Sequence, residues 1–203
     1  MSTSDACKDP SELVLVTGAS GFIATHCVKI LLENGYRVRG SLRSLKDEKK
    51  CAPLRKLVEN PKYPIELVEA DLLNENSWLN AVKDCTFVLH TASPFPLEDP
   101  KDENELIIPA LDGTLFVLRA CAQEGSQVKR VVLTSSVAAI LSEDYENGRV
   151  FSEKDWSDPS LLTPYLKSKT LAEQAAWNFL NERKSAGLPC FELAVINPSF
   201  VMV

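Results

Sequence analysis

The chain has 203 residues, of which 45% are hydrophobic and 25% are charged. This balance is typical of a globular domain with a core and excludes a disordered or collagen-like chain. The formal charge of −6 disfavours a general nucleic-acid binder. The sequence holds no apolar run long enough to cross a membrane, and its polar start lacks the apolar core of a secretory signal. We therefore expect a cytoplasmic protein that has neither a nucleic-acid nor a membrane partner.

The cysteines and histidines argue against a metal site. Six cysteines are scattered singly, none of them in a closely spaced pair, and there are only two histidines. A zinc site in a chain of this kind requires closely spaced Cys and His ligands, so no metal is expected. Because a secretory signal is lacking, the cysteines are expected to be reduced thiols. His26 and His90 are expected to have structural roles.

Short apolar runs alternate with helical patterns along the chain. Strands are predicted at residues 13–16, 36–41, 65–69, 86–90, 131–134 and 191–196, with helices between them at 22–34, 46–59, 76–83, 111–123 and 164–184. This alternation indicates right-handed crossovers and a parallel sheet covered on both faces. We therefore predict an α/β fold with a doubly wound parallel sheet, a Rossmann fold. The domain is expected to span residues 11–203, after a polar N-terminal tail at residues 1–10.

A glycine-rich segment, TGASGFIA, joins the first predicted strand to the first predicted helix. Gly18 permits a tight turn, and Gly21 lets the backbone come close to a pyrophosphate. The amides at the helix N-terminus then face the phosphates, where the helix dipole is positive. Strand, turn and helix in this order predict a dinucleotide-binding site, and an ordinary turn is the alternative.

The end of the second strand distinguishes NAD from NADP. An NAD site offers a carboxylate there for the ribose 2′-hydroxyl, but this stretch is VRGSLR, with no acid before Asp47. An arginine attracts a 2′-phosphate and can bind it with two hydrogen bonds. Arg43 is the first candidate and Lys50 the second. Both lie in a segment, residues 37–56, with eight basic and two acidic residues; a solvated helix face is the alternative for this patch.

Tyr165 and Lys169 are four residues apart in the longest predicted helix, so they share a face. A neighbouring ammonium lowers the pKa of a phenol from its usual value of ~10. Tyr165 could then exchange a proton with a carbonyl or alcohol oxygen while a hydride moves at the carbon. A hydroxyl from Ser135 or Ser136, at the end of the fifth strand, could hold that oxygen. The alternatives are an amphipathic helix face and serines that bond only the local backbone.

These motifs, in this order, resemble the extended short-chain dehydrogenase/reductases of the NAD-dependent epimerase/dehydratase superfamily. Within them the chain is most similar to the dihydroflavonol 4-reductase and cinnamoyl-CoA reductase group of NADPH-dependent carbonyl reductases. The likeness covers Leu13 to Val201. It is carried by TGASGFIA, the pair Asp71-Leu72, HTASPF from His90, TSS from Thr134, YLKSKTLAEQAAW from Tyr165 and INPSFV from Ile196.

The resemblance implies a role for each matching residue. Ser136, Tyr165 and Lys169 would form the catalytic triad, and Lys169 would also hold the nicotinamide ribose. Residues expected to bind NADP(H) are Gly18, Ser20, Gly21, Phe22 and Ile23 at the pyrophosphate, Arg43 and Lys50 at the 2′-phosphate, Asp71 and Leu72 at the adenine, Thr91, Ala92 and Ser93 along the cofactor, and Pro198, Ser199, Phe200 and Val201 near the nicotinamide, together with Tyr165 and Lys169.

The activity that the resemblance implies is NADPH-dependent reduction of an aldehyde or ketone on a small molecule. Members usually continue from the INPSFV segment into a substrate-binding lobe, whereas this chain ends in apolar residues soon after it. The chain is therefore expected to be truncated, with that lobe largely missing. Flavonoid reductases carry a polar substrate contact just after TSS, where this chain has apolar residues 138–141, which disfavours a flavanonol substrate.

Three alternatives to such a reductase remain. The first is a truncated NADP-binding module with little or no turnover, because substrate positioning supplies a large part of the rate. The second is a sugar-nucleotide epimerase or dehydratase, against which Arg43 argues, and the third is a hydroxysteroid dehydrogenase. The residues do not indicate an oligomeric state.

Overall fold

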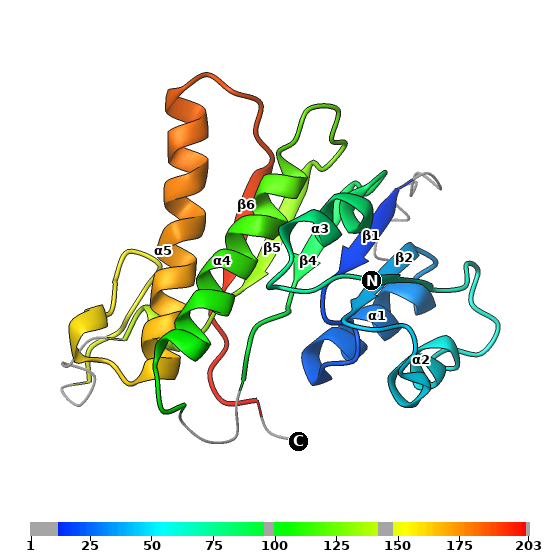
Figure 1. The fold of residues 1–203 in the computed structure, drawn as a ribbon, viewed down its shortest axis with the longest axis horizontal. Coiled ribbons are helices and arrows are strands. Elements are labelled where there is room, and N and C mark those ends of the chain that lie inside the picture. The colour runs from blue at the N-terminus through cyan, green and yellow to red at the C-terminus, as the bar shows by residue number, and fades with distance from the viewer. Residues whose placement is uncertain (1–11, 96–99, 142–147, 202–203) are drawn as a thin grey trace, which may run out of the picture.

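A single parallel sheet organises the chain. The computed structural model describes residues 12–95, 100–141 and 148–201, so the tail predicted at residues 1–10 lies outside the described residues. The described strands follow the order β3-β2-β1-β4-β5-β6, all parallel (Figure 1). This order reverses between β1 and β4, as in a dinucleotide-binding fold. The strands are β1 (Leu13–Val16), β2 (Arg37–Leu42), β3 (Glu66–Glu69), β4 (Phe87–His90), β5 (Arg130–Thr134) and β6 (Glu192–Ile196).

Helices cover both faces of this sheet, as the prediction of a doubly wound sheet required. One core contains residues of α1 (Phe22–Glu33) and α2 (Glu48–Arg55), and the other contains residues of α3 (Glu75–Val82), α4 (Asn104–Cys121) and α5 (Pro164–Ser185). Successive residues of β1 enter opposite cores, because side chains alternate along a strand. Leu15 belongs to the α3–α5 core and Val16 to the α1–α2 core. The predicted fold class is confirmed.

The register of the strands brings their carboxyl ends to one edge of the sheet. Val16 of β1 is paired with Leu89 of β4, and Thr134 of β5 is paired with Ile196 of β6. The residues that follow these strands therefore lie at the same edge, where parallel sheets carry their ligand sites. A short 3-10 helix, η1 (Val137–Ala139), follows β5 there, and a second, η3 (Pro159–Leu161), precedes α5.

The elements that differ most from prediction are α4 and α2. Helix α4 begins at Asn104, seven residues before the predicted start at residue 111, and contains Pro109. Proline disfavours a helix interior, but the early turn is stabilised by the burial of Leu106 and by an ion pair between Glu103 and Lys167 of α5. Helix α2 is shorter than predicted and ends at Arg55. Tertiary contacts outweighed local propensity in α4.

Two further properties concern the described residues alone. No helix there is long and apolar enough to cross a membrane. No group of three or more His, Cys, Asp or Glu side chains there is placed to hold a metal ion.

Candidate active site

The glycine-rich turn lies between β1 and α1, at the carboxyl edge of the sheet. Gly18 has a φ of +63°, a conformation that side chains disfavour, and a Cβ added there would lie 3.1 Å from the Cβ of Ala92. Gly21 is the N-cap of α1, and the N–H of Gly21 donates to the Gly18 carbonyl at 2.8 Å. The first turn of α1 has no acidic residue, and no side chain of the described residues caps it. Its leading amides are therefore available to an anion.

Residues at the end of β2 accept hydrogen bonds from the glycine-rich turn. The backbone N–H of Gly18 donates to the Ser41 hydroxyl at 3.1 Å, and the N–H of Ala19 donates to the Ser41 carbonyl at 2.9 Å. Arg43 follows two residues later, just after the end of β2, and is exposed. Lys50 lies on α2, where its ammonium is 3.5 Å from the carboxylate of Asp47. The second candidate for the 2′-phosphate thus already has an anionic neighbour.

The loop after β4 is joined to the turn through the hydroxyl of Thr17. This oxygen accepts hydrogen bonds from the N–H groups of Thr91 and Ala92, both at 3.0 Å, and lies 2.9 Å from Nδ1 of His90. Because the oxygen already accepts twice, its own proton is donated to Nδ1, which leaves the ring proton on Nε2. His90 is buried, and burial together with the charge of Lys169 lowers the pKa of His90 to about 3. His90 is therefore a neutral structural residue.

Lys169 connects α5 to the end of β5. Its ammonium donates to the carbonyl of Thr134, the last residue of that strand, at 3.0 Å, and the residue is 7% exposed. Burial lowers the pKa of Lys169 to about 8, against a smaller raising effect of Glu173. Ser136 follows Thr134 by two residues, so the structure brings two of the three predicted triad residues to one strand end.

Tyr165 lies in the first turn of α5 and is half-buried. Its ring meets that of Phe95, from the loop after β4, edge to face with centroids 5.2 Å apart. Burial raises the pKa of Tyr165, so the predicted lowering of this pKa is wrong for this structure. Burial disfavours the phenolate, and the nearby ammonium is directed to the β5 carbonyl instead. Among the described contacts, no hydrogen bond joins Tyr165 to Ser136 or Lys169.

The two candidate serines differ in their hydrogen bonds. Ser136 is buried at the N-terminus of η1, where its hydroxyl oxygen accepts from the N–H of Ala138 at 3.2 Å. The hydroxyl of Ser135 is also buried, and it has no partner among the described residues. The amide nitrogen of Asn197, just after β6, donates to the Ser136 carbonyl at 3.0 Å. Ser136 is thus the more firmly held of the two at this edge.

The remaining predicted cofactor-binding residues differ in their contacts and in their exposure. Asp71 accepts from the N–H of Leu73 at 3.0 Å in a local turn, and Leu72 packs against Gly113 of α4. The carbonyl of Pro198 accepts from the N–H of Val137 at 3.0 Å, which brings the INPSFV segment beside the Ser136 turn. Exposed positions at this edge are Ser20, Phe22, Ser199, Phe200 and Val201, and partly exposed ones are Ile23, Thr91, Ala92 and Ser93.

Sequence reasoning missed four polar residues that organise this edge, namely Thr17, Ser41, Glu173 and Asn197. Each acts through a partner distant in the chain, so its role depends on the fold. Glu173 had one local signal, since it follows Lys169 by four residues on α5, the spacing that also relates Lys169 to Tyr165.

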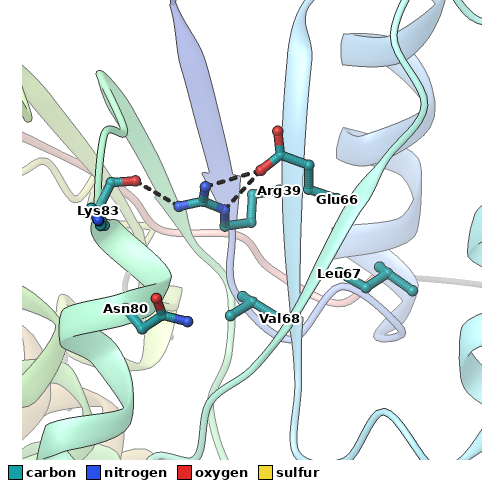
Figure 2. Close-up of a pocket in the computed structure, with 6 residues that line it drawn as sticks. All are labelled: Arg39, Glu66, Leu67, Val68, Asn80 and Lys83. Carbon is teal, nitrogen blue, oxygen red and sulfur yellow. Dashed lines mark hydrogen bonds and ion pairs between the residues drawn. The ribbon is translucent and has the colours of Figure 1, made fainter.

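A separate hollow of about 420 Å³ lies between β2, β3 and α3, away from the carboxyl edge (Figure 2). Figure 2 shows the guanidinium of Arg39 directed at Glu66 on one side and at the end of α3 on the other. All three of its nitrogens donate to protein acceptors, among them the Ala81 carbonyl at 3.0 Å. The Arg39 guanidinium therefore stabilises the C-terminus of α3 by donating to its last carbonyls. The hollow is lined by Arg39, Glu66, Leu67, Val68, Asn80 and Lys83.

Comparison with known proteins identifies the family. Residues 14–194 match the sequence model of the NAD dependent epimerase/dehydratase family. The chain belongs to this family. The match of this epimerase/dehydratase member begins within β1 and ends within β6. The resemblance inferred from the motifs is confirmed.

Relatives of this epimerase/dehydratase member include named reductases. The chain is 43% identical to "Cinnamoyl-CoA reductase CAD2" of Medicago truncatula over 94% of its own length and 58% of the relative's. It is 38% identical to "Bifunctional dihydroflavonol 4-reductase/flavanone 4-reductase" of Malus domestica over 93% of its length and 55% of the relative's. The solved structure of Gre2 from Candida albicans in complex with NADPH is 37% identical, with a TM-score of 0.79, over 93% of this chain and 58% of that one. The chain thus spans little more than half the length of these proteins.

Proposed function

We propose that the chain is the cofactor-binding part of an NADPH-dependent reductase that acts on an aldehyde or ketone of a small molecule, in the cytoplasm, with a triad of Ser136, Tyr165 and Lys169. The observation that carries this proposal is the hydrogen bond from Lys169 to Thr134 at 3.0 Å. It fixes the Tyr165 helix against the strand end that continues into Ser136, at the same end of the parallel sheet as the glycine turn. Relatives named as reductases of carbonyl compounds support the same reaction class.

The turn and its surroundings fit NADP(H). The segment of Gly18, Ser20, Gly21, Phe22 and Ile23 would hold the pyrophosphate at the uncapped start of α1, where no acid repels it. The donors would be the amides of Ser20, Phe22 and Ile23, because the N–H groups of Gly18 and Gly21 already donate within the protein. Arg43, which is exposed two residues after Ser41, would bind the 2′-phosphate, and Lys50 would be a second cation near it. The nicotinamide would supply the hydride when the cofactor is bound. The other contacts proposed are Asp71 and Leu72 beside the adenine, Thr91, Ala92 and Ser93 along the cofactor, Lys169 at the ribose, and Pro198, Ser199, Phe200 and Val201 near the nicotinamide.

The protein's own part in the reaction is to hold the carbonyl and to deliver a proton. The hydroxyl of Ser136 holds the carbonyl oxygen, and the phenol of Tyr165 donates its proton to that oxygen as the carbon gains a hydride, so the product is an alcohol. The raised pKa of Tyr165 keeps the phenol protonated at neutral pH, which is the form that can donate. Lys169, as an ammonium, stabilises the phenolate that forms.

The test combines binding and turnover. NADPH binding is measured by calorimetry, and turnover is followed as loss of NADPH absorbance with a panel of aldehydes and ketones. Tyr165→Phe removes only the proton donor, so we expect NADPH binding to persist while turnover falls about 100-fold or more. Tyr63→Phe, in the loop before β3, is the matched control and should leave both unchanged. A chain that binds no NADPH, or a Tyr165→Phe variant with full turnover, would overturn the proposal.

A second candidate function is an NADP-binding module with little turnover. The observation that favours it is that the chain spans only 58% and 55% of two named reductases, and substrate positioning contributes much of an enzyme's rate. Tight NADPH binding without turnover on any member of the panel would support the module, and turnover that depends on Tyr165 would exclude it.

A further inference from the structure

We propose that Glu173, a buried carboxylate with no part in the reaction above, is a positioning residue that anchors Asn197 on the Ser136 turn and supports the charge of Lys169. This inference rests on the proposed function, because it concerns the same triad. It adds a link between α5 and the segment after β6.

Glu173 is 5% exposed and uses both carboxylate oxygens. One oxygen accepts from the amide nitrogen of Asn197 at 2.8 Å, and the other accepts from the indole nitrogen of Trp177 at 3.3 Å. The same nitrogen of Asn197 also donates to the Ser136 carbonyl at 3.0 Å. An amide nitrogen has two hydrogens, so Asn197 is held between the carboxylate and the turn.

This link lies between two backbone hydrogen bonds that join the same segments. The N–H of Ser135 donates to the Ile196 carbonyl at 2.8 Å, and the N–H of Val137 donates to the Pro198 carbonyl at 3.0 Å. The Asn197 side chain supplies the bond at Ser136 itself, on the residue between these two. Glu173 therefore holds the Asn197 side chain in the position from which it donates to the Ser136 carbonyl.

The electrostatic part concerns Lys169, one helical turn before Glu173 on the same face of α5. The Lys169 ammonium is buried, and its one hydrogen bond among the described residues goes to the uncharged Thr134 carbonyl. The groups that act on it come from two elements. On β4 lies His90, whose pKa is lowered by burial and by the charge of Lys169; on α5 lies Glu173, whose negative charge raises the pKa of Lys169. No ion pair joins Glu173 and Lys169 in the described part of the chain, so this charge acts through space.

A purely structural carboxylate would give the same hydrogen bonds, so the test must separate charge from bonding. Glu173→Gln alone is ambiguous, since Trp177 and Asn197 donate to different carboxylate oxygens and the amide nitrogen would replace one of these acceptors. In a Trp177→Phe background only Asn197 remains as donor, and Gln can accept from it. Comparing Trp177→Phe with the double variant Glu173→Gln/Trp177→Phe therefore isolates the charge.

The readout is the NMR titration of the Lys169 side chain in the cofactor-free protein, assigned with Lys169→Arg. We expect the titration midpoint of Lys169 to be lower by about 0.5–1 pH unit in the double variant than in Trp177→Phe. Glu182→Gln, an exposed acid on the same helix, is the matched control and should not move it. An unchanged midpoint in a folded double variant would overturn the electrostatic part.

The positioning part is tested by hydrogen exchange. Asn197→Leu keeps the size of the side chain and removes its donors, so we expect exchange at the N–H groups of Ser135 and Val137 to become about tenfold faster or more, with the Lys169 midpoint unchanged. Unchanged exchange in that variant would overturn the anchoring role. Neither readout needs NADPH or turnover, so a failed reductase assay and a failed positioning role give different results.

Discussion

A buried pair, Thr17 and His90, ties the glycine turn to the loop after β4. The pKa of His90 is about 3 in the folded chain, compared with 6.5 for an ordinary His. Between these pH values the unfolded chain binds a proton that the folded chain does not. The contribution of His90 to the free energy of unfolding therefore rises with pH across this window. That contribution is lost as the pH falls from about 6.5 toward 3. Protonation of one side chain opposes folding in acid.

His90→Asn removes this titration, while its side-chain oxygen can still accept from the Thr17 hydroxyl. We expect His90 to contribute a loss of about 3 kcal/mol in the wild-type free energy of unfolding between pH 7 and pH 4, and the variant to lack that loss. Urea unfolding at both pH values measures the difference. His26→Asn, at an exposed position on α1, should keep the wild-type acid sensitivity. An equal loss in wild type and His90→Asn would contradict the argument.

Arg43 is the residue on which cofactor preference depends in the proposed function. Arg43→Asp replaces a cation with an anion that repels a 2′-phosphate and can accept from a ribose hydroxyl. We expect the ratio of NADPH to NADH affinity to fall about 10- to 100-fold, as measured by calorimetry with both cofactors. Arg55→Asp makes the same charge change within the basic segment, where Arg55 is paired with Glu48, and should shift the ratio much less. An unchanged ratio in Arg43→Asp would remove that residue from the site.

At the level of elements, α4 depends on a glycine at a close contact. A Cβ added to Gly113 would lie 2.7 Å and 2.8 Å from two carbons of Leu72, which is closer than side chains approach. Glycine lets this helix pack directly on the turn after β3. The usual helix preference for alanine over glycine, about 1 kcal/mol, is reversed here by sterics.

Gly113→Ala should therefore destabilise the wild-type chain by about 1–2 kcal/mol, because overpacking exceeds the gain in helix propensity. In a Leu72→Ala background the obstruction is gone, and the same substitution should become neutral or stabilising. Thermal or urea unfolding of the four proteins gives the coupling between the two sites. A cost for Gly113→Ala that is the same in both backgrounds would show that Leu72 is not its cause.

The strands and the glycine turn could be predicted because their signals are local. The runs LVLV and FVLH and the motif TGASG each specify their own structure within a few residues. The start of α4 could not, since Leu106 and the Glu103–Lys167 ion pair act across the fold. The same holds for the candidate site. The motif identified Tyr165 and Lys169 by spacing, whereas the pairing of Asn197 with Ser136 joins residues 61 positions apart.

At the level of the whole molecule, the two faces of the sheet are unequally covered. The α3–α5 core includes Leu193 and Val195 of β6, whereas the α1–α2 core includes no residue of β5 or β6. On that second face Ala194 is exposed and Ile196 is 55% exposed. In the described sheet β6 pairs only with β5 and is therefore an outer strand with one unpaired side. The same face carries Glu192, which is ion-paired with Arg130. Exposed Ala194 and Ile196 beside an open strand edge favour association between chains.

The isolated chain is therefore expected to self-associate as its concentration rises. Ala194→Lys places a charge on the uncovered face without filling the core, and it should shift the sedimentation of the chain toward the monomer while its circular dichroism stays unchanged. Leu161→Lys, at an exposed apolar position in η3, is the matched control and should not alter association. Monomeric wild-type chain at every concentration would contradict the expectation.

The bond between Asn197 and Ser136 also sets the order in which the site can be completed during synthesis. Thr17 and His90 can meet as soon as β1 and β4 have paired, and Lys169 can reach Thr134 once α5 has formed. Asn197, however, follows β6, the last strand among the described residues. A nascent chain still held in the ribosomal tunnel short of this point would have its glycine turn in place, while its Ser136 turn would still lack the side-chain bond from Asn197.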